Sequence, residues 1–504
     1  MTTIADLACR ERRGRILARV EAWLTLHVKG AIVRWLFWKV RDRAKVAGIV
    51  AKKYLVSGFD AAILFDGRPG EFYNPDPLVT SSVDHWRIER RRRRVLVFAE
   101  AVTLAHVARA VTLAHSLDSS RYEVHLVCDP RYLSLFHELD FPVHPIHSIN
   151  SEVFQGRLAQ GRPLYTSREL RQYVQEDLRL MSDWKPDLVI GDFRLSLSVS
   201  ARLSCVPYAA MTNAYWSPYA RPRFLVPELA ITERFGLRVA QGIFDVIRPF
   251  VFAQHVYGFN KVRREYGLPT VGYNLNHMFS DADYTLYPDL PTVVPTINPP
   301  SHHRYIGPVV WSFGKLPSWW SSLRDNVPTA YVTMGTSGRD DIARTVAHSL
   351  AHMGWQVLMA TADRGSVTGT RESVWIANYL PGLAAARKAD LVVCNGGSGA
   401  VYQALAAGTP VLGIPMNLDQ YLMMDYIRRS EAGDYIRAGM VSPELVTQVV
   451  RRMVESPQYK TRAVHLRDQI FHYRTSERLH ACVDDILHDG TEVPSCQYPI
   501  VAAC

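Results

Sequence analysis

The segment from residue 391 to residue 400 restricts the fold of this chain more than any other. Four apolar residues, Leu391–Cys394, lead into Asn395 and then into a glycine-rich turn formed by Gly396, Gly397, Ser398 and Gly399. A short apolar run is typical of a buried parallel strand, and the glycines allow a tight turn into the helical pattern that follows. A strand, a glycine turn and a helix N-terminus can bind a diphosphate, but a purely structural turn has the same pattern.

Short apolar runs alternate with helical patterns along most of the chain. The runs lie at 95–99, 122–128, 186–192, 207–211, 330–335, 357–362, 374–380, 391–394 and 411–415. This alternation predicts parallel sheets covered by helices, and the proline-rich stretch between the two groups predicts a linker. We therefore expect an α/β protein with two facing Rossmann-like domains and a ligand cleft between the carboxyl ends of their strands.

A length of 504 residues suits two or three domains. We expect a basic helical N-terminal extension, an N-terminal Rossmann-like domain, a linker, a C-terminal Rossmann-like domain, and a C-terminal helix with a tail. In that order, these five segments cover residues 1–93, 94–285, 286–328, 329–475 and 476–504.

The N-terminal extension carries most of the net charge of +10. Residues 1–56 hold 13 Lys and Arg against 4 Asp and Glu, and the stretch 22–50 combines basic residues with clustered Trp and Phe. This composition predicts an amphipathic helix that either lies on an anionic membrane surface or packs against the rest of the protein. The arginines at 90–94 end directly at a strand without stacking aromatic residues, so we expect no nucleic acid partner.

The cysteines and the N-terminal residues indicate in which cellular compartment we expect the protein. Seven cysteines are scattered along the chain without a C-x-x-C pair, which argues against a disulfide framework or a zinc site and for a reducing environment. No apolar window is long enough for a membrane-spanning helix, and charged residues interrupt any N-terminal signal. We therefore expect a cytoplasmic protein, with peripheral membrane contact left open.

Beyond the glycine turn, residues 391–420 resemble the nucleotide-sugar signature of the UDP-glycosyltransferase family, which includes plant, animal and bacterial members and the carotenoid and macrolide glycosyltransferases. The residues in register are Gly396, Gly397, Ala404, Leu405, Gly408, Pro410, Pro415, Asp419 and Gln420. The resemblance covers about residues 94–475 and implies the GT-B architecture. It also implies an inverting, metal-independent transfer of a hexose from a nucleoside-diphosphate sugar, a UDP-sugar, to a hydroxyl of a small apolar acceptor such as a lipid, pigment or other secondary metabolite. No cofactor beyond this co-substrate is implied.

The resemblance also assigns the residues that bind the donor. In the family the glycine turn holds the diphosphate, a terminal acid–Gln pair binds the sugar, an aromatic residue stacks on the base, and a loop closes on the phosphates. These roles fall on Thr336, Tyr379, Asn395, Gly396, Gly397, Ser398, Gly399, Gln403, Asp419 and Gln420. Asn395 replaces the family's phosphate-contacting His, and Gln403 replaces the Glu that binds the ribose hydroxyls, so charge-assisted hydrogen bonds would be lost at both positions.

The segment 99–114 resembles the family's first loop-to-helix segment, in which His106 falls on the catalytic histidine. A neutral imidazole can take the proton of the acceptor hydroxyl near pH 7. Asp192, at the end of the run 186–192, resembles the partner aspartate that holds the other imidazole nitrogen. No His/Cys cluster suggests a metal site, which agrees with the metal-independent transfer that the resemblance implies.

Two other functions stay open at this point. A nucleotide-sugar 2-epimerase or hydrolase of the same fold would carry more acidic and His residues in the cleft than His106 and Asp192. A catalytically inactive binding relative would keep the fold, and the replacements at Asn395 and Gln403 are compatible with it.

Overall fold

The computed structural model describes residues 91–136, 139–363, 369–371 and 373–489. The basic helix predicted within residues 22–50 lies outside these residues, as do the rest of the extension up to residue 90 and the tail from residue 490.

In the described part of the chain, the first sheet has seven parallel strands in the order β3-β2-β1-β4-β5-β6-β7. The strands are β1 (Arg93–Ala99), β2 (Tyr122–Cys128), β3 (Val143–Pro145), β4 (Leu188–Asp192), β5 (Tyr208–Met211), β6 (Tyr284–Tyr287) and β7 (His303–Tyr305). The helices among them are α4 (Leu104–Ser116), α5 (Ser151–Ala159), α6 (Ser167–Trp184), α7 (Leu197–Leu203), α8 (Ala230–Glu265) and α9 (Leu275–Phe279). This strand order is that of a Rossmann-type sheet, with the reversal between β1 and β4.

The second sheet has the order β10-β11-β9-β8-β12-β13-β14, and within the described residues only β10 is antiparallel to its neighbour. Its strands are β8 (Thr329–Thr333), β9 (Gln356–Ala360), β10 (Gly369–Arg371), β11 (Val374–Ala377), β12 (Leu391–Cys394), β13 (Val411–Gly413) and β14 (Gly433–Tyr435). A 3-10 turn, Gly335–Ser337, follows β8. The helices are α10 (Asp340–His352), α11 (Gly382–Lys388), α12 (Ser398–Ala406), α13 (Leu418–Arg429), α14 (Pro443–Glu455), α15 (Pro457–Tyr473) and α16 (Thr475–Asp489).

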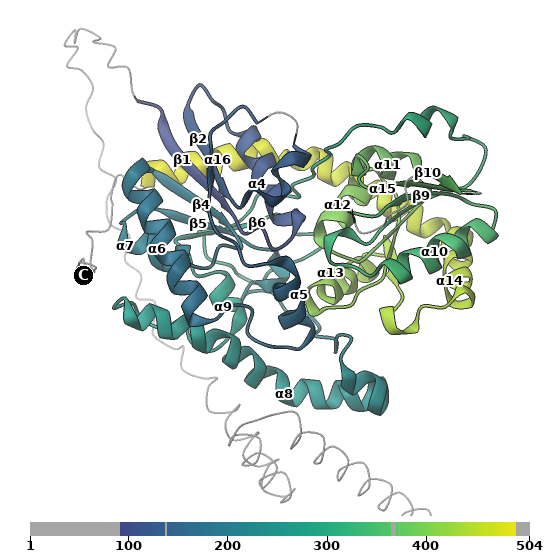
Figure 1. Cartoon of the computed structure of the whole chain (residues 1–504), viewed down its shortest axis with the longest axis horizontal. Helices are drawn as coiled ribbons and strands as arrows, with labels where there is room; N and C mark the ends of the chain where they lie inside the picture. Colours follow the sequence, from purple (N-terminus) through teal and green to yellow (C-terminus); the bar gives the residue numbers. More distant parts are fainter. Residues whose placement is uncertain (1–90, 137–138, 364–368, 372, 490–504) are drawn as a thin grey trace, which may run out of the picture. The chain divides into compact units, whose positions relative to one another are not determined.

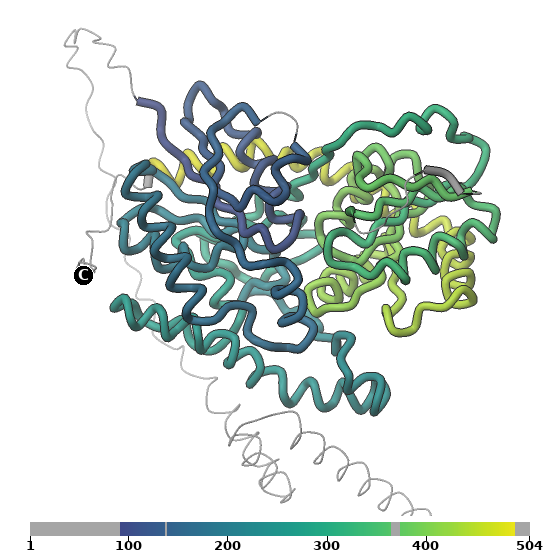
Figure 2. The backbone as a smooth tube through the Cα atoms, viewed as in Figure 1, coloured from purple at the N-terminus to yellow at the C-terminus, as the bar shows by residue number. Residues whose placement is uncertain are grey.

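Each sheet is buried on both faces, as its apolar strands require. Alternate residues of β1 point to opposite sides, so Val95 and Val97 pack with α4 and α16, whereas Leu96 and Phe98 pack with α6 and α7. In the second sheet, α10 and α14 cover one face and α11, α12, α13 and α15 cover the other (Figure 1). The chain path in Figure 2 shows the C-terminal helix α16 returning to the first sheet, where it contacts α4.

The predicted fold class, α/β with two Rossmann-like sheets, is confirmed. The stretch 286–328, predicted as a linker from its prolines, contains β7, which pairs with β6 at the edge of the first sheet. Three residues suffice for this pairing, and so short a strand leaves no periodicity that a sequence pattern could reveal.

Candidate active site

The strand order of the first sheet reverses between β1 and β4, and these two strands end side by side. Ala99 is in register with Asp192, and the backbone N–H of Glu100 donates to the backbone oxygen of Asp192 at 3.0 Å. In open parallel sheets a ligand crevice lies at this reversal, outside the carboxyl ends of the strands. The two residues predicted as a catalytic pair both lie here, because α4 begins at Leu104 and carries His106 in its first turn.

His106 and Asp192 form a hydrogen-bonded pair. His106 Nδ1 lies 2.8 Å from Asp192 Oδ1. The aspartate is fully buried, whereas 19% of the His106 side chain is exposed. An ionised carboxylate only accepts hydrogen bonds, so Nδ1 donates and the lone pair of the neutral ring lies on Nε2. A general base held by a carboxylate needs this tautomer.

Arg109 completes the pair, although the sequence analysis assigned it no role. Its Nε and Nη2 atoms donate to the two carboxylate oxygens of Asp192, each at 2.6 Å. Burial alone would raise the pKa of Asp192, but the charge of Arg109, then the charge that His106 carries when it is protonated, and the hydrogen bonds from both residues outweigh it, so the pKa of this carboxyl lies below its usual range. The three-residue spacing from His106, which puts both side chains on one helix face, was the available signal.

Phe193, the residue after Asp192, packs against the His106 imidazole. The two rings are stacked, with centroids 4.9 Å apart and 9° between their planes. The backbone of Phe193 has φ +60°, a left-handed conformation that non-glycine residues rarely adopt and that often marks functional loops. Three more aromatic rings contact Phe193, those of Phe154, Tyr165 and Phe279. One face of the imidazole therefore lies against an aromatic cluster that begins with Phe193.

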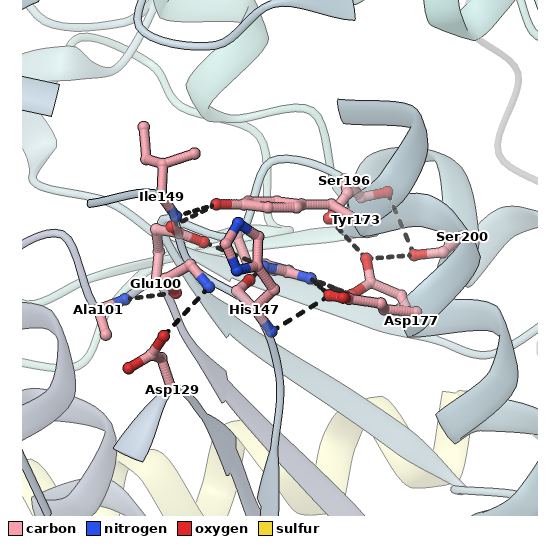
Figure 3. A network of polar contacts seen from close by, with 12 residues as sticks. Glu100, Ala101, Asp129, His147, Ile149, Tyr173, Asp177, Ser196 and Ser200 are labelled. Carbon is pink, nitrogen blue, oxygen red and sulfur yellow. Dashed lines mark hydrogen bonds and ion pairs between the residues drawn. The ribbon is translucent and has the colours of Figure 1, made fainter. Parts of the chain in front are cut away.

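A buried ionic network joins the segments that follow β1 and β4 (Figure 3). Arg194, two residues after Asp192, lies 3.2 Å from Glu100 and 3.1 Å from Asp177 of α6, and all three side chains are 0% exposed. The hydroxyl of Tyr173 donates to Glu100 at 3.0 Å, and its ring lies 3.7 Å from the Arg194 guanidinium. The network thus fixes the backbone from which the His–Asp pair projects.

The glycine-rich turn leads from β12 into α12, which begins at Ser398 and so two residues earlier than predicted. Gly396 has φ +79°, a conformation that glycine adopts without strain. Asn395 braces the turn, because its Oδ1 accepts from the N–H of Gly397 at 3.1 Å and its Nδ2 donates to Ser337 Oγ at 3.0 Å. The start of α12 presents N–H groups and the positive end of a helix dipole, which suit a phosphate.

Trp311, from the stretch predicted as a linker, covers the first turn of α12. A β-carbon on Gly399 would lie 2.1 Å from a ring carbon of Trp311, so glycine is required beneath this ring. Gln403, one turn further along, donates from Nε2 to the backbone oxygen of Trp311 at 2.9 Å. The side chain predicted to bind ribose is therefore engaged within the protein, by a residue that the sequence analysis did not single out.

The other predicted donor residues lie on three further segments. Thr336 lies in the 3-10 turn after β8, where its hydroxyl accepts from the N–H of Leu104 at 3.4 Å. Asp419 and Gln420 lie in the first turn of α13, and Gln420 is the third residue of a capping box. Tyr379 follows β11, which β9 and β8 separate from β12.

Hydrogen bonds connect the donor segments with the elements around His106. Trp216 Nε1 donates to Asp419 Oδ1 at 2.8 Å. Asn213 Oδ1 accepts from Arg109 Nη1 at 3.2 Å and from Ser398 Oγ at 3.4 Å. Residues predicted separately, from distant parts of the sequence, thus adjoin one another in one site.

Among the described residues, no group of three or more His, Cys, Asp and Glu could hold a metal ion. None of the helices described is both long and apolar enough to cross a membrane. Among the described residues, Cys128, Cys394 and Cys482 are buried free thiols.

The fold and the site together define a class of enzyme. Two Rossmann-like sheets, with a His–Asp pair at the reversal of the first and a glycine-rich turn at the β8–β12 reversal of the second, have the architecture of a glycosyltransferase of the GT-B type. Residues 345–481 match the family described as Erythromycin biosynthesis protein CIII-like, C-terminal domain.

Relatives identify the family. The PGL/p-HBAD biosynthesis rhamnosyltransferase of Mycobacterium bovis (strain BCG / Pasteur 1173P2) is 48% identical over 379 residues, 75% of this chain and 84% of that protein. An inactive PGL/p-HBAD biosynthesis glycosyltransferase of the same strain is 49% identical over 261 residues, 52% of this chain and 71% of that protein. The structure of spinosyn rhamnosyltransferase SpnG complexed with thymidine diphosphate has a TM-score of 0.54 at 19% identity and covers 75% of this chain and 96% of that one. This chain belongs to the glycosyltransferase family of the PGL/p-HBAD biosynthesis enzymes, and the epimerase alternative is not supported.

Proposed function

We propose that this glycosyltransferase transfers a rhamnosyl group from a nucleoside-diphosphate sugar to a hydroxyl of an apolar acceptor, with inversion at the anomeric carbon and without a metal ion. The single observation that carries the proposal is the His106–Asp192 hydrogen bond of 2.8 Å, in which the imidazole keeps Nε2 for a proton. Its neighbour Arg109 shares Asn213 with Ser398 at the glycine turn, which brings base and diphosphate site together.

The proposed reaction is one displacement. His106 Nε2 takes the proton of the acceptor hydroxyl while the hydroxyl oxygen bonds to the anomeric carbon from the side opposite the phosphate. The bond between the anomeric carbon and the phosphate oxygen breaks, and its electron pair leaves with the nucleoside diphosphate. Asp192 stabilises the positive charge that His106 acquires. The N-terminus of α12 stabilises the negative charge on the leaving diphosphate, as preorganised N–H dipoles do.

The donor in this proposal combines two sources of support. The rhamnosyl group comes from the name of the relative that is 48% identical to this chain. For the nucleotide, the family resemblance implies uridine, whereas the SpnG structure contains thymidine diphosphate. The proposed donor is therefore rhamnose on one of these two diphosphates, and both are compared directly.

An apolar acceptor is supported by the aromatic rings around His106. Phe193 stacks on the imidazole, and Trp216, half-buried, lies between Phe279 and Phe224 while its indole N–H reaches Asp419. An apolar acceptor dissolves in membranes, so the basic amphipathic stretch 22–50, outside the described residues, supports peripheral placement on an anionic surface.

The test measures release of UDP or TDP from the corresponding rhamnose donors by the full chain, with and without an alkylphenol as a probe acceptor. We expect acceptor-dependent release that survives EDTA, and a product of inverted configuration by NMR. His106→Ala should lower kcat by about 10²–10⁴-fold, the usual contribution of a general base. Its dissociation constant for the diphosphate, measured by calorimetry, should change less than about twofold, because the diphosphate contacts lie on α12.

A His106→Ala variant with full kcat would overturn the assignment of the base. A wild-type chain that binds neither UDP nor TDP would favour an inactive relative, a possibility that the inactive relative of 49% identity makes concrete. Retained configuration in the product, or loss of activity in EDTA, would refute the inverting, metal-independent reaction.

A further inference from the structure

Arg109 makes contacts that a merely structural arginine would not need. It is 6% exposed, lies one helical turn from His106, and binds both oxygens of Asp192 in a fork, each at 2.6 Å. Asp192 Oδ1 therefore accepts from His106 Nδ1 and from Arg109 Nη2 at the same time, and Arg109 Nη2 also lies 3.2 Å from His106 Nδ1. Bidentate, charge-assisted pairs of this kind fix the plane of a carboxylate as well as its position.

The charge of Arg109 decides the state of Asp192. Asp192 is 0% exposed, and a lone carboxylate in such a place is costly to ionise. The charged or titratable groups that face it are His106 and Arg109, both on α4, and Arg109 in turn lies near Asp289 and Tyr215. Without the guanidinium, burial would raise the pKa of Asp192, and a protonated Asp192, which carries a donor O–H as well as an acceptor oxygen, would no longer force His106 into the tautomer with Nε2 free.

Arg109 also reaches the donor side of the site. Its Nη1 donates to Asn213 Oδ1 at 3.2 Å, the oxygen that also accepts from Ser398 Oγ. Asn213 Nδ2 donates to Asp289 at 3.2 Å, and Asp289 accepts from the hydroxyl of Tyr402 at 2.9 Å. Ser398 and Tyr402 are both on α12, so two points of the helix that begins at the glycine turn connect to Arg109.

We propose that Arg109 is a positioning residue of the transfer reaction. It keeps Asp192 ionised and oriented, so that Asp192 fixes His106 with Nε2 directed to the acceptor, and it ties this pair to α12. The proposal deepens the proposed function and rests on it. Arg109 acts through Asp192 and takes no part in any bond change.

A double-mutant cycle tests whether Arg109 acts through Asp192. The variants of the full chain are Arg109→Met, Asp192→Asn and both together, with kcat measured from nucleoside diphosphate release. We expect each single change to lower kcat by about 10²-fold and the double variant to be no slower than Asp192→Asn, because residues that act as a unit are not additive. Separate structural effects would instead multiply to about 10⁴-fold.

Three further measurements separate positioning from a loss of structure. Arg109→Lys, which restores the charge without the fork, should recover part of kcat relative to Arg109→Met. The kcat defect of Arg109→Met should be largest near pH 6 and shrink toward pH 9, because a raised pKa of Asp192 leaves it protonated until the pH is higher. Arg157→Met is the matched control. Arg157, on α5, donates to both carboxylate oxygens of Glu169 at 2.8 and 2.9 Å, and its replacement should leave kcat and its pH profile unchanged.

Multiplicative effects in the cycle, or a pH-independent defect in Arg109→Met, would overturn the proposal. If Arg109→Met does not fold, two other variants decide the question. The double variant has no unpaired buried charge at this pair, and Arg109→Lys keeps a cation beside Asp192, so the kcat of each is compared with that of Asp192→Asn. These failures differ from a failure of the proposed function, which would show first in the wild type or in His106→Ala.

Discussion

Replacing Arg194 by Met tests whether the buried ionic network supports the loops of the site. Arg194 faces Glu100 and Asp177, and none of the three side chains is exposed. The change leaves two buried carboxyls without their shared cation. Removing one partner of a buried ion pair costs about 3–5 kcal/mol. If the part around the first sheet unfolds as a cooperative unit of roughly 150–250 residues, this corresponds to a fall in Tm of roughly 6–20 °C.

The pH dependence has a definite sign. Burial raises the pKa of both Glu100 and Asp177, and the charge of Arg194 is the largest opposing influence. A carboxyl whose pKa is higher in the folded than in the unfolded chain contributes stability at low pH, and this contribution is lost as the pH rises through the folded pKa. Without Arg194 both values rise further. The destabilisation of Arg194→Met should therefore be smallest near pH 5 and grow toward pH 8.

The assay is thermal unfolding of the wild type, Arg194→Met, and a triple variant with Glu100→Gln, Asp177→Asn and Arg194→Met, at four pH values from 5 to 8. The triple variant should recover most of the lost Tm at pH 8, because neutral side chains of the same shape carry no uncompensated charge. Equal losses in Arg194→Met at all pH values, or no recovery in the triple variant, would mean that packing around Tyr173, and not charge, holds this network.

Two further predictions concern the donor side and the N-terminal extension. Gln403→Glu should weaken UDP or TDP binding by up to about tenfold in calorimetry, because a carboxylate cannot donate to the Trp311 backbone oxygen and the loss of a hydrogen bond costs about 0.5–1.5 kcal/mol. Unchanged binding, with Gln448→Glu at an exposed position of α14 as the control, would contradict this. Deleting residues 1–56 should abolish sedimentation with anionic liposomes, which salt should also weaken, and leave kcat on a water-soluble acceptor intact. Liposome binding that survives the deletion would place the membrane contact elsewhere.

Those parts of the fold whose patterns are local and repeated were predictable from the sequence. The apolar runs at 95–99 and 391–394 and the helical pattern after residue 104 correspond to β1, β12 and α4. The short strands β7 and β14 were missed, because three residues that pair only at a sheet edge carry no periodicity of their own. Their existence depends on partners that lie far away in the chain.

The residues of the candidate site also fall into two groups, those that the sequence predicted and those that it did not. His106 and Asp192 were predicted by resemblance, and the structure places them 2.8 Å apart. Arg109 and Phe193 were missed, although Arg109 is three residues from His106 and Phe193 directly follows Asp192 in the sequence. The role of Arg109 depends on which strand end faces α4, and that of Phe193 on a left-handed backbone angle, and neither is encoded by residue type.

The two departures from the family pattern illustrate what side-chain chemistry adds to a sequence match. From the sequence, the replacement of the family's His by Asn395 and of its Glu by Gln403 predicted only weaker contacts to the nucleotide-sugar donor. In the structure, however, Asn395 uses its oxygen for Gly397 and its nitrogen for Ser337, so one amide ties the glycine turn to the turn after β8. Gln403 likewise uses its NH₂ group to hold Trp311 over α12, a bond that an ionised Glu could not donate. An amide supplies a donor and an acceptor at once, so both replacements stabilise the shape of the glycine turn and of α12, where we propose that the diphosphate binds.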